Sequence, residues 1–365
     1  MPNTFPSVLV IGASYGLLPA AKIAAAGMSV TVVGHPEEVA AINRDGVEVH
    51  FDPQRCLVPP IGASGLSAKT TENLQQDDYD LVILAVQEPQ ARAPEIAALL
   101  EELGVGHPIA SIMNMPPPPF LSRNASLKSL IKPGVYSSSA VWAEMADSRM
   151  TLASPDPQAY RFDPDRPGAL QVSLASNFKF APFEDPEDQA LLVQVCRRTS
   201  RVRAPWGKVP VNFVTKSSLF TPLAKWPMLV TGNCRCLSDD YLAPYSIREA
   251  VNKNIAESRS LYEAINAALR NIGTPSETLV PFDHYVAVSQ KLSRPSSIAM
   301  ALARRAVAVE RIDLLVLELL LHSHAKPQVI DVMTQVSNRI SECLHANVQG
   351  RCGIKPLTLV AKSRK

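Results

Sequence analysis

The alternation of apolar and polar positions near the N-terminus predicts a strand, a helix and a second strand in close succession. Residues 8–11 form a short, continuous apolar run rich in β-branched side chains, which is typical of a buried strand. Residues 17–26 are good helix formers, with Gly27 just beyond them as a helix cap, and residues 29–33 form a second apolar run. This succession within about thirty residues predicts a βαβ unit with parallel strands.

The same alternation continues along the first half of the chain and then changes. We expect strands over 47–51, 81–86 and 109–113, and helices over 36–44, 94–103 and 186–198. Between Tyr136 and Phe183, short apolar runs separated by polar turns predict antiparallel additions to the sheet, over 136–142, 150–152, 159–162 and 169–176. From Trp206 nearly to Asn347 the pattern predicts helices with almost no strand, over 209–224, 245–272, 285–290, 297–321 and 327–344.

The turn between the first strand and the first helix, Gly12-Ala-Ser-Tyr-Gly16, has the position of a dinucleotide-binding fingerprint. In such units the glycines allow close approach of the backbone, and the helix amides point at the pyrophosphate. Here Ser14 replaces the second glycine of G-x-G-x-x-G, and Gly16 comes one residue early. The turn predicts a nucleotide cradle made by Gly12, Ser14, Tyr15 and Gly16; the alternative is a βαβ unit that binds no nucleotide.

These elements predict an α/β fold: an N-terminal Rossmann-type doubly wound sheet with added antiparallel strands, followed by an all-α domain. The expected divisions are a dinucleotide-binding domain over 1–204, a helical substrate domain over 205–350 and a basic tail over 351–365. Functional groups of open parallel sheets lie at the carboxyl ends of the strands. Gly12, Gln87 and Asn114 all stand at such ends.

Composition narrows the function classes. The chain has 365 residues, 46% of them hydrophobic, and a net charge of +2, which gives no reason to expect nucleic acid or a membrane as partner. The six cysteines are scattered, which favours a reducing compartment, and no signal peptide is recognisable, so we expect a cytoplasmic protein. Cys234-Arg-Cys236 is too closely spaced for half of a zinc site, so we expect no metal.

The stretch APWGKVPVNFVTKSSLFTPLA, which contains Trp206, Lys208 and Asn212, resembles the W-x-K-L-x-x-N-x-x-x-N-x-L-T-A-L segment that opens the helical domain of ketopantoate reductases (2-dehydropantoate 2-reductases). The resemblance implies a cytoplasmic NADPH-dependent enzyme of pantothenate biosynthesis. By that resemblance Lys208 is the general acid, Asn114 lies near the nicotinamide and the substrate, and Asn212 binds the substrate. A lysine is chemically suited, because an ammonium stabilises the charge that hydride builds on a ketone oxygen and then donates a proton.

Several positions depart from that family's pattern. Lys216 replaces a second asparagine, and on the expected helix it would form one stripe with Lys208 and Asn212. Gln87 stands where the family has a lysine near the cofactor phosphate. A substrate-binding glutamate of the late helix corresponds to Glu310 or Arg311, depending on the alignment. Lys216 and Arg311 would add positive charge to the expected pocket, which suits an anionic α-keto acid. That acid need not be ketopantoate.

The end of the second strand bears on the choice of cofactor. NAD enzymes carry an acid there and NADP enzymes an arginine. This chain has His35, which can pair with a 2′-phosphate and favours NADP(H), followed by Glu37 and Glu38, which would favour NAD if they fold back.

Other functions remain open at this stage. One is an opine-type dehydrogenase that joins a keto acid to an amine, and another is a non-catalytic NAD(P)-binding protein. A homodimer is compatible with the apolar run from Leu314 to Leu321, although core packing explains that run as well.

Overall fold

The computed structural model describes residues 5–52, 54–74, 79–104, 106–143, 145–237 and 243–350. The chain divides into two compact units. The α/β unit comprises Met1–Ser129 and Ser137–Pro222, and the helical unit comprises Leu130–Tyr136 and Leu223–Lys365. The division falls after the expected boundary at Ala204, because residues 205–222 continue the α/β unit. The expected basic tail lies outside the described residues.

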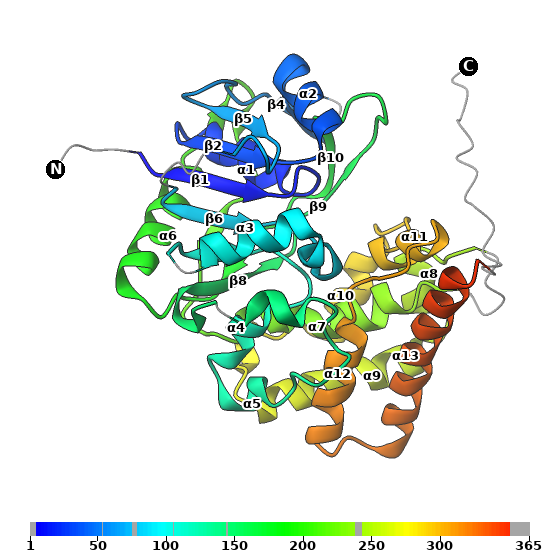
Figure 1. Ribbon diagram of the computed structural model, residues 1–365. Helices are drawn as coiled ribbons and strands as arrows, with labels where there is room; N and C mark the ends of the chain where they lie inside the picture. The colour runs from blue at the N-terminus through cyan, green and yellow to red at the C-terminus, as the bar shows by residue number, and fades with distance from the viewer. Residues whose placement is uncertain are drawn as a thin grey trace, which may run out of the picture. The chain divides into compact units, whose positions relative to one another are not determined.

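An eight-stranded sheet is the centre of the α/β unit (Figure 1). Six of its strands are parallel, β11 runs antiparallel to β8, and β14 runs parallel to β11. In spatial order the strands are β14 (Phe213–Thr215), β11 (Phe178–Phe180), β8 (Met150–Pro155), β7 (Ile109–Ser111), β6 (Leu81–Leu84), β1 (Ser7–Ile11), β2 (Ser29–Val33) and β5 (Leu66–Lys69). The Rossmann-type sheet is therefore confirmed, whereas the antiparallel direction expected for β8 is wrong.

Four of the helices expected beside this sheet are present: α1 (Leu17–Ala24), α2 (Pro36–Asp45), α3 (Pro94–Gly104) and α6 (Pro186–Thr199). Every residue of α1 is buried, since α1 packs on β2 and α6. The proline run after Asn114 leads into a helix: Pro118 is the first residue of the short helix α4 (Pro118–Ser122), a position where a proline loses no hydrogen bond. The helix α5 (Ala125–Lys128) follows it, capped by the Asn124 side chain.

A second, four-stranded sheet belongs to the same unit, in the order β4 (Arg55–Leu57), β3 (Glu48–Asp52), β10 (Ala169–Leu174) and β9 (Gln158–Arg161). Here the antiparallel additions expected from sequence are found in β9 and β10. Single-turn 3₁₀ helices are η1 (Glu88–Arg92), η2 (Ser139–Trp142) and η3 (Asp147–Arg149). The strand expected over 136–142 is therefore wrong, since that segment ends in η2.

The helix expected over 209–224 is also wrong. Residues 203–208 form a hairpin of β12 (Arg203–Ala204) and β13 (Gly207–Lys208), and β14 then joins the main sheet beside β11. Val209, Val211 and Phe213 are buried whereas the residues between them are half-buried, so burial alternates with the period of a strand. Val211 has a φ of 63°, which no α-helix accommodates and which strains a β-branched residue.

The helical unit contains the expected helices, but two long ones are each split in two. The break before Ile255 has the Asn254 side chain as a helix cap, and the segment 304–311 separates α11 from α12. The elements are η4 (Thr221–Lys225), whose first two residues belong to the α/β unit, α7 (Trp226–Met228), the π-helical turn η5 (Leu229–Cys234), α8 (Ile247–Asn252), α9 (Ile255–Asn271), η6 (Ser276–Thr278), α10 (Phe282–Ser289), α11 (Ser297–Ala303), α12 (Ile312–His322) and α13 (Pro327–Val348).

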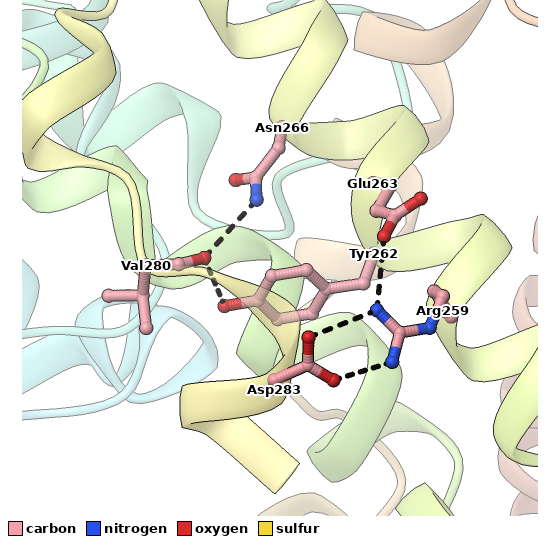
Figure 2. A network of polar contacts seen from close by, with 6 residues as sticks. All are labelled: Arg259, Tyr262, Glu263, Asn266, Val280 and Asp283. Atoms are coloured by element: carbon pink, nitrogen blue, oxygen red, sulfur yellow. Dashed lines mark hydrogen bonds and ion pairs between the residues drawn. The ribbon is translucent and has the colours of Figure 1, made fainter.

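Figure 2 shows how α9 is tied to the start of α10. Tyr262 Oη and Asn266 Nδ2 both donate to the carbonyl oxygen of Val280, at 3.0 and 3.3 Å. At the exposed end of this contact, Arg259 Nη2 pairs with Asp283 Oδ1 at 2.5 Å. The buried tyrosine therefore supplies the hydrogen bond that is shielded from water, and the ion pair lies at the solvent boundary.

None of the described helices is long and apolar enough to cross a membrane.

Candidate dinucleotide-binding site

The Gly12 turn has a backbone that only glycine accommodates well. Gly12 has a φ of +115°, and its N–H donates to the carbonyl of Val33 at the end of β2, at 3.0 Å. A Cβ on Gly12 would lie 2.9 Å from the carbonyl oxygen of Ala85, and a Cβ on Gly16 would overlap the carbonyl oxygen of Gly12. Both glycines of the altered fingerprint are therefore required by close backbone approach.

The N-terminus of α1 is equipped to hold an anion. Within the described part of the chain, the amides of Ser14, Tyr15 and Gly16 donate to no backbone or side-chain acceptor, and Ser14 is exposed. Unpaired amides at a helix start, together with the positive end of the helix dipole, bind phosphate groups. These amides and the helix dipole therefore make this turn suitable for the pyrophosphate of a dinucleotide.

Arg161, which sequence analysis did not single out, reaches this turn from β9. Its Nη2 donates to the carbonyl oxygen of Ala13 and its Nη1 pairs with Glu38 Oε1, both at 2.6 Å. Glu38 Oε2 in turn accepts a hydrogen bond from the amide of His35, at 3.1 Å. An acid and an arginine therefore meet beside His35, just after β2, where the adenosine ribose of a dinucleotide is recognised.

Tyr15 is occupied by the protein rather than available to a ligand. Its hydroxyl donates to the carbonyl of Pro157 at 2.6 Å, and its ring packs edge-on against Phe178. Burial, followed by the charge of Asp156, raises the pKa of this phenol well above its usual value, so the hydroxyl keeps its proton and its hydrogen bond. Tyr15 anchors the turn to the start of β9.

The start of η1, which follows β6, carries a buried carboxylate next to the predicted site residue Gln87. The side chain of Glu88 is 1% exposed and accepts hydrogen bonds from Ser137 Oγ, Ser138 N and Ser138 Oγ, at 2.6–3.0 Å. Trp142 Nε1 also donates to Ser138 Oγ, at 2.8 Å. This network ties the segment after β6 to η2, and Gln87 and Asn114 both lie half-buried just after neighbouring strands β6 and β7.

Sheet register brings Asn212 to the same edge and takes Lys216 away from it. Phe178 pairs with Pro155 at the carboxyl end of β8 and with Phe213, so Asn212 precedes β14 at the carboxyl edge of the parallel strands. Its Oδ1 is buried and has no hydrogen-bond partner within the described chain. Lys216 follows β14 at the opposite edge and is exposed. The predicted helical stripe of Lys208, Asn212 and Lys216 does not exist.

Lys208 is an exposed residue of the β12–β13 hairpin, opposite Arg203. The buried side chain of Lys22, in α1, donates from Nζ to the carbonyl oxygens of Val209 and Pro210, at 2.5 and 2.9 Å. Burial, and then the charges of Lys208 and Arg203, lower the pKa of Lys22 to about 7. Lys22 therefore fastens the segment that holds the strained Val211.

The two remaining candidates belong to the helical unit. Glu310 is 1% exposed, so its carboxyl group is enclosed by protein. Arg311 Nε and Nη2 both donate to the carboxylate of Asp313, and Nη2 also donates to Ser337 O and Ser341 Oγ on α13. Those nitrogens of Arg311 join α12 to α13, so a role of Glu310 or Arg311 toward a substrate stays a prediction.

Comparison with known proteins identifies the fold. Residues 8–115 match the family model described as Ketopantoate reductase PanE/ApbA, which confirms the resemblance seen in the sequence. A protein assigned as a ketopantoate reductase from Ralstonia solanacearum MolK2 is 16% identical, with a TM-score of 0.66 over 94% of this chain and 99% of that chain. No curated protein matches the chain in sequence.

Two other solved structures are informative. D-mandelate dehydrogenase, solved with NADH and anilino(oxo)acetate, is 12% identical and has a TM-score of 0.61, covering 93% of this chain and 99% of that chain. A dimeric ketopantoate reductase from Staphylococcus aureus is 11% identical with a TM-score of 0.58, again covering 93% and 99%. At these identities the likeness establishes the shared fold.

Proposed function

We propose that this chain is a reductase that uses a nicotinamide dinucleotide to reduce the carbonyl group of an α-keto acid. The observation that carries the proposal is the turn from Gly12 to Gly16, where two glycines are sterically required and three amides at the start of α1 have no acceptor among the described residues. The family match over residues 8–115 includes this turn. D-mandelate dehydrogenase, which shares the fold, was solved with NADH and an oxoacetate, and this supports the substrate class.

The residues of this chain would bind the parts of the dinucleotide at the positions that are usual for a Rossmann-type sheet. The amides of Ser14, Tyr15 and Gly16 would hold the pyrophosphate, and the segment around His35 would hold the adenosine ribose. Bound dihydronicotinamide supplies the hydride. Gln87 and Asn114, just after β6 and β7, are the polar groups that would orient the reacting carbonyl.

Lys208 is our candidate for the proton donor, on the strength of its resemblance to the lysine of ketopantoate reductases. When hydride reaches a ketone carbon, the oxygen becomes an alkoxide, and an ammonium both stabilises it and returns it to a hydroxyl. Lys208 is exposed, and Asn212, four residues later, precedes β14 at the carboxyl edge. We expect Lys208→Ala to lower kcat at least about 100-fold, while Arg203→Ala, at the facing position of the hairpin, keeps most of the activity.

We propose NADH as the preferred cofactor, although His35 and the resemblance favour NADPH. Glu38 folds back, accepts the amide of His35 and occupies Arg161, so a carboxylate lies where a 2′-phosphate would be received. The Glu38 carboxylate would repel the 2′-phosphate of NADPH, whereas the 2′-hydroxyl of NADH can donate a hydrogen bond to it.

A second candidate is a dinucleotide-binding protein without reductase activity, and one observation favours it. In ketopantoate reductases the segment W-x-K-L opens the helical domain, whereas Lys208 here lies in a hairpin of the α/β unit. Three residues after Leu223, where the main segment of the helical unit begins, this chain has Trp226-Pro-Met228-Leu229, which has the same spacing of tryptophan and leucine with methionine in the lysine's place. A methionine cannot supply a proton.

One experiment separates these functions. Binding of NADH and NADPH is measured by fluorescence, and their oxidation is followed with ketopantoate and other α-keto acids, with and without an added amine. Turnover with a keto acid alone supports the proposal, and turnover with ketopantoate in particular supports a part in pantothenate biosynthesis. A requirement for the amine indicates an opine-type dehydrogenase. Binding without any oxidation, unchanged in Lys208→Ala, contradicts reductase activity and leaves the second candidate.

Two further proposals concern the assembly and the location of the chain. A dimeric ketopantoate reductase shares the fold, so we propose a homodimer, which light scattering of the purified chain would test. We propose a cytoplasmic location from the scattered cysteines, and the five that lie in the described chain are free thiols. Fractionation of the producing cell would test the location.

A further inference from the structure

Three different metal-ligating side chains converge on the adjacent strands β3 and β4 of the four-stranded sheet. His50 Nε2 lies 3.0 Å from Glu48 Oε2 and 3.7 Å from Cys56 Sγ, and all three donor atoms are within 4.8 Å of one another. We propose that Glu48, His50 and Cys56 form a binding site for a divalent transition-metal ion, with Zn²⁺ as the expected occupant and water completing the coordination.

The register of the sheet explains why these residues meet. Glu48 and His50 are two positions apart on β3, so their side chains share one face. Cys56 on β4 is the cross-strand partner of His50, so it projects from the same face directly beside the histidine. Val49 and its cross-strand partner Leu57 are buried on the other face. A shift of one residue would expose them, so their burial fixes the register of β3 against β4. Sequence spacing alone does not reveal this site, because E-x-H-x₅-C matches no common zinc motif.

The separations suit a tetrahedral ion. With metal–sulfur and metal–nitrogen bonds of about 2.3 and 2.0 Å, donors around zinc lie about 3.3–3.6 Å apart. The histidine nitrogen lies at 3.0 and 3.7 Å from its two neighbours, so small side-chain rotations complete the site. A thiolate, an imidazole and a carboxylate are a donor set that suits zinc, whereas Mg²⁺ and Ca²⁺ prefer oxygen alone.

The surroundings orient two of the ligands and leave access for the ion. Arg166 Nη2 binds Glu48 Oε1 at 2.7 Å, so the other oxygen, Oε2, faces His50. The ring of Phe162 packs edge-on against the imidazole of His50, with centroids 5.2 Å apart. Trp206 Nε1 donates to the carbonyl oxygen of Cys56 at 3.1 Å, which fixes β4 beneath the thiol. The side chains of His50 and Glu48 are 24% and 31% exposed, which admits a metal and a water ligand.

The proposal is tested on the full chain, freed of metal by a chelator and kept in a non-thiol reductant, by titration with Co²⁺ and then Zn²⁺. We expect one Co²⁺ per chain, tetrahedral visible bands, a thiolate-to-cobalt charge-transfer band in the near ultraviolet, and displacement of all of them by Zn²⁺. Cys56→Ser must abolish the charge-transfer band, and His50→Gln must weaken binding at least about 100-fold.

Matched variants make the outcome decisive. Two variants serve as controls. Cys196→Ala removes a buried thiol of α6, and His284→Gln removes an exposed histidine of α10. We expect neither to change the Co²⁺ spectra. We expect Arg166→Gln to weaken Co²⁺ binding about tenfold, because Arg166 no longer holds the carboxylate of Glu48 in its orientation toward His50. Circular dichroism verifies that each variant is folded. Absence of a one-to-one complex, or a charge-transfer band that persists in Cys56→Ser, overturns the proposal.

Discussion

Arg161 and Glu38 form an ion pair of 2.6 Å just after β2, although 123 positions separate them in the chain. β9 brings the guanidinium to the Gly12 turn, and the carboxylate folds back from the first turn of α2. The pair joins β9 of the four-stranded sheet to α2, beside the predicted site of the adenosine ribose. Its balance of charge therefore bears directly on which dinucleotide binds.

Removing the charge of Glu38 is expected to shift this preference. In Glu38→Gln the repulsion of a 2′-phosphate disappears and Arg161 becomes available to it, so the ratio of NADPH to NADH affinity should rise about tenfold or more, which is about 1.4 kcal/mol. Dissociation constants from fluorescence titration measure the ratio. Glu37→Gln, which neutralises the exposed neighbour, is the control and should leave it near that of the unchanged chain. An unaltered ratio in Glu38→Gln contradicts this assignment.

Gly12 and Gly27 offer a matched pair of substitutions. Both have positive φ, but a Cβ on Gly12 meets the Ala85 carbonyl whereas a Cβ on Gly27 meets nothing within 4 Å. Gly27→Ala should cost about 1 kcal/mol of unfolding free energy, and Gly12→Ala about 2–4 kcal/mol together with most of the dinucleotide affinity. Urea unfolding and NADH titration measure these effects. Equal losses in the two variants would show that close approach at Gly12 is unimportant.

Lys22 predicts a pH dependence of stability. Its pKa is about 7 in the folded chain and near 10.5 when unfolded, so between these values the unfolded chain holds one more proton. Stability from this group therefore rises with pH above about 7, by about 1.4 kcal/mol per unit, and is flat below. The free energy of unfolding of the unchanged chain minus that of Lys22→Met, measured between pH 6 and 9, isolates the slope. A difference that does not vary with pH would disprove the lowered pKa.

Glu88 is expected to be needed for the fold around Gln87. Glu88→Gln keeps one oxygen and replaces the other by an amide nitrogen, so at least one buried donor of Ser137 or Ser138 loses its acceptor and the remaining hydrogen bonds lose a charged one. The expected loss is about 2–3 kcal/mol of unfolding free energy. Glu95→Gln, an exposed change on α3, should be nearly neutral. Denaturant unfolding of both variants makes the comparison, and similar stabilities would argue against the buried network.

The limits of local pattern are clearest between Val209 and Phe213. Apolar residues at 209 and 213 have helical spacing, whereas the buried set, which adds Val211, alternates with a period of two. Pairing of β14 with β11, the positive φ of Val211 and the hydrogen bonds from Lys22 decide for extended chain. The strand pairing and the hydrogen bonds depend on residues distant in sequence, so no local signal predicts them.

The chain's sequence by itself determined the βαβ unit, the strongly apolar parallel strands, the glycine turn and the helical second half. Each of these depends on steric and hydrophobic preferences that act within a few residues. Only the tertiary structure decided that Arg161 meets Glu38, that Asn212 and Lys216 lie at opposite edges, and that Glu48, His50 and Cys56 face one another. Those juxtapositions follow from strand order and register, which the free energy of the whole packed sheet selects.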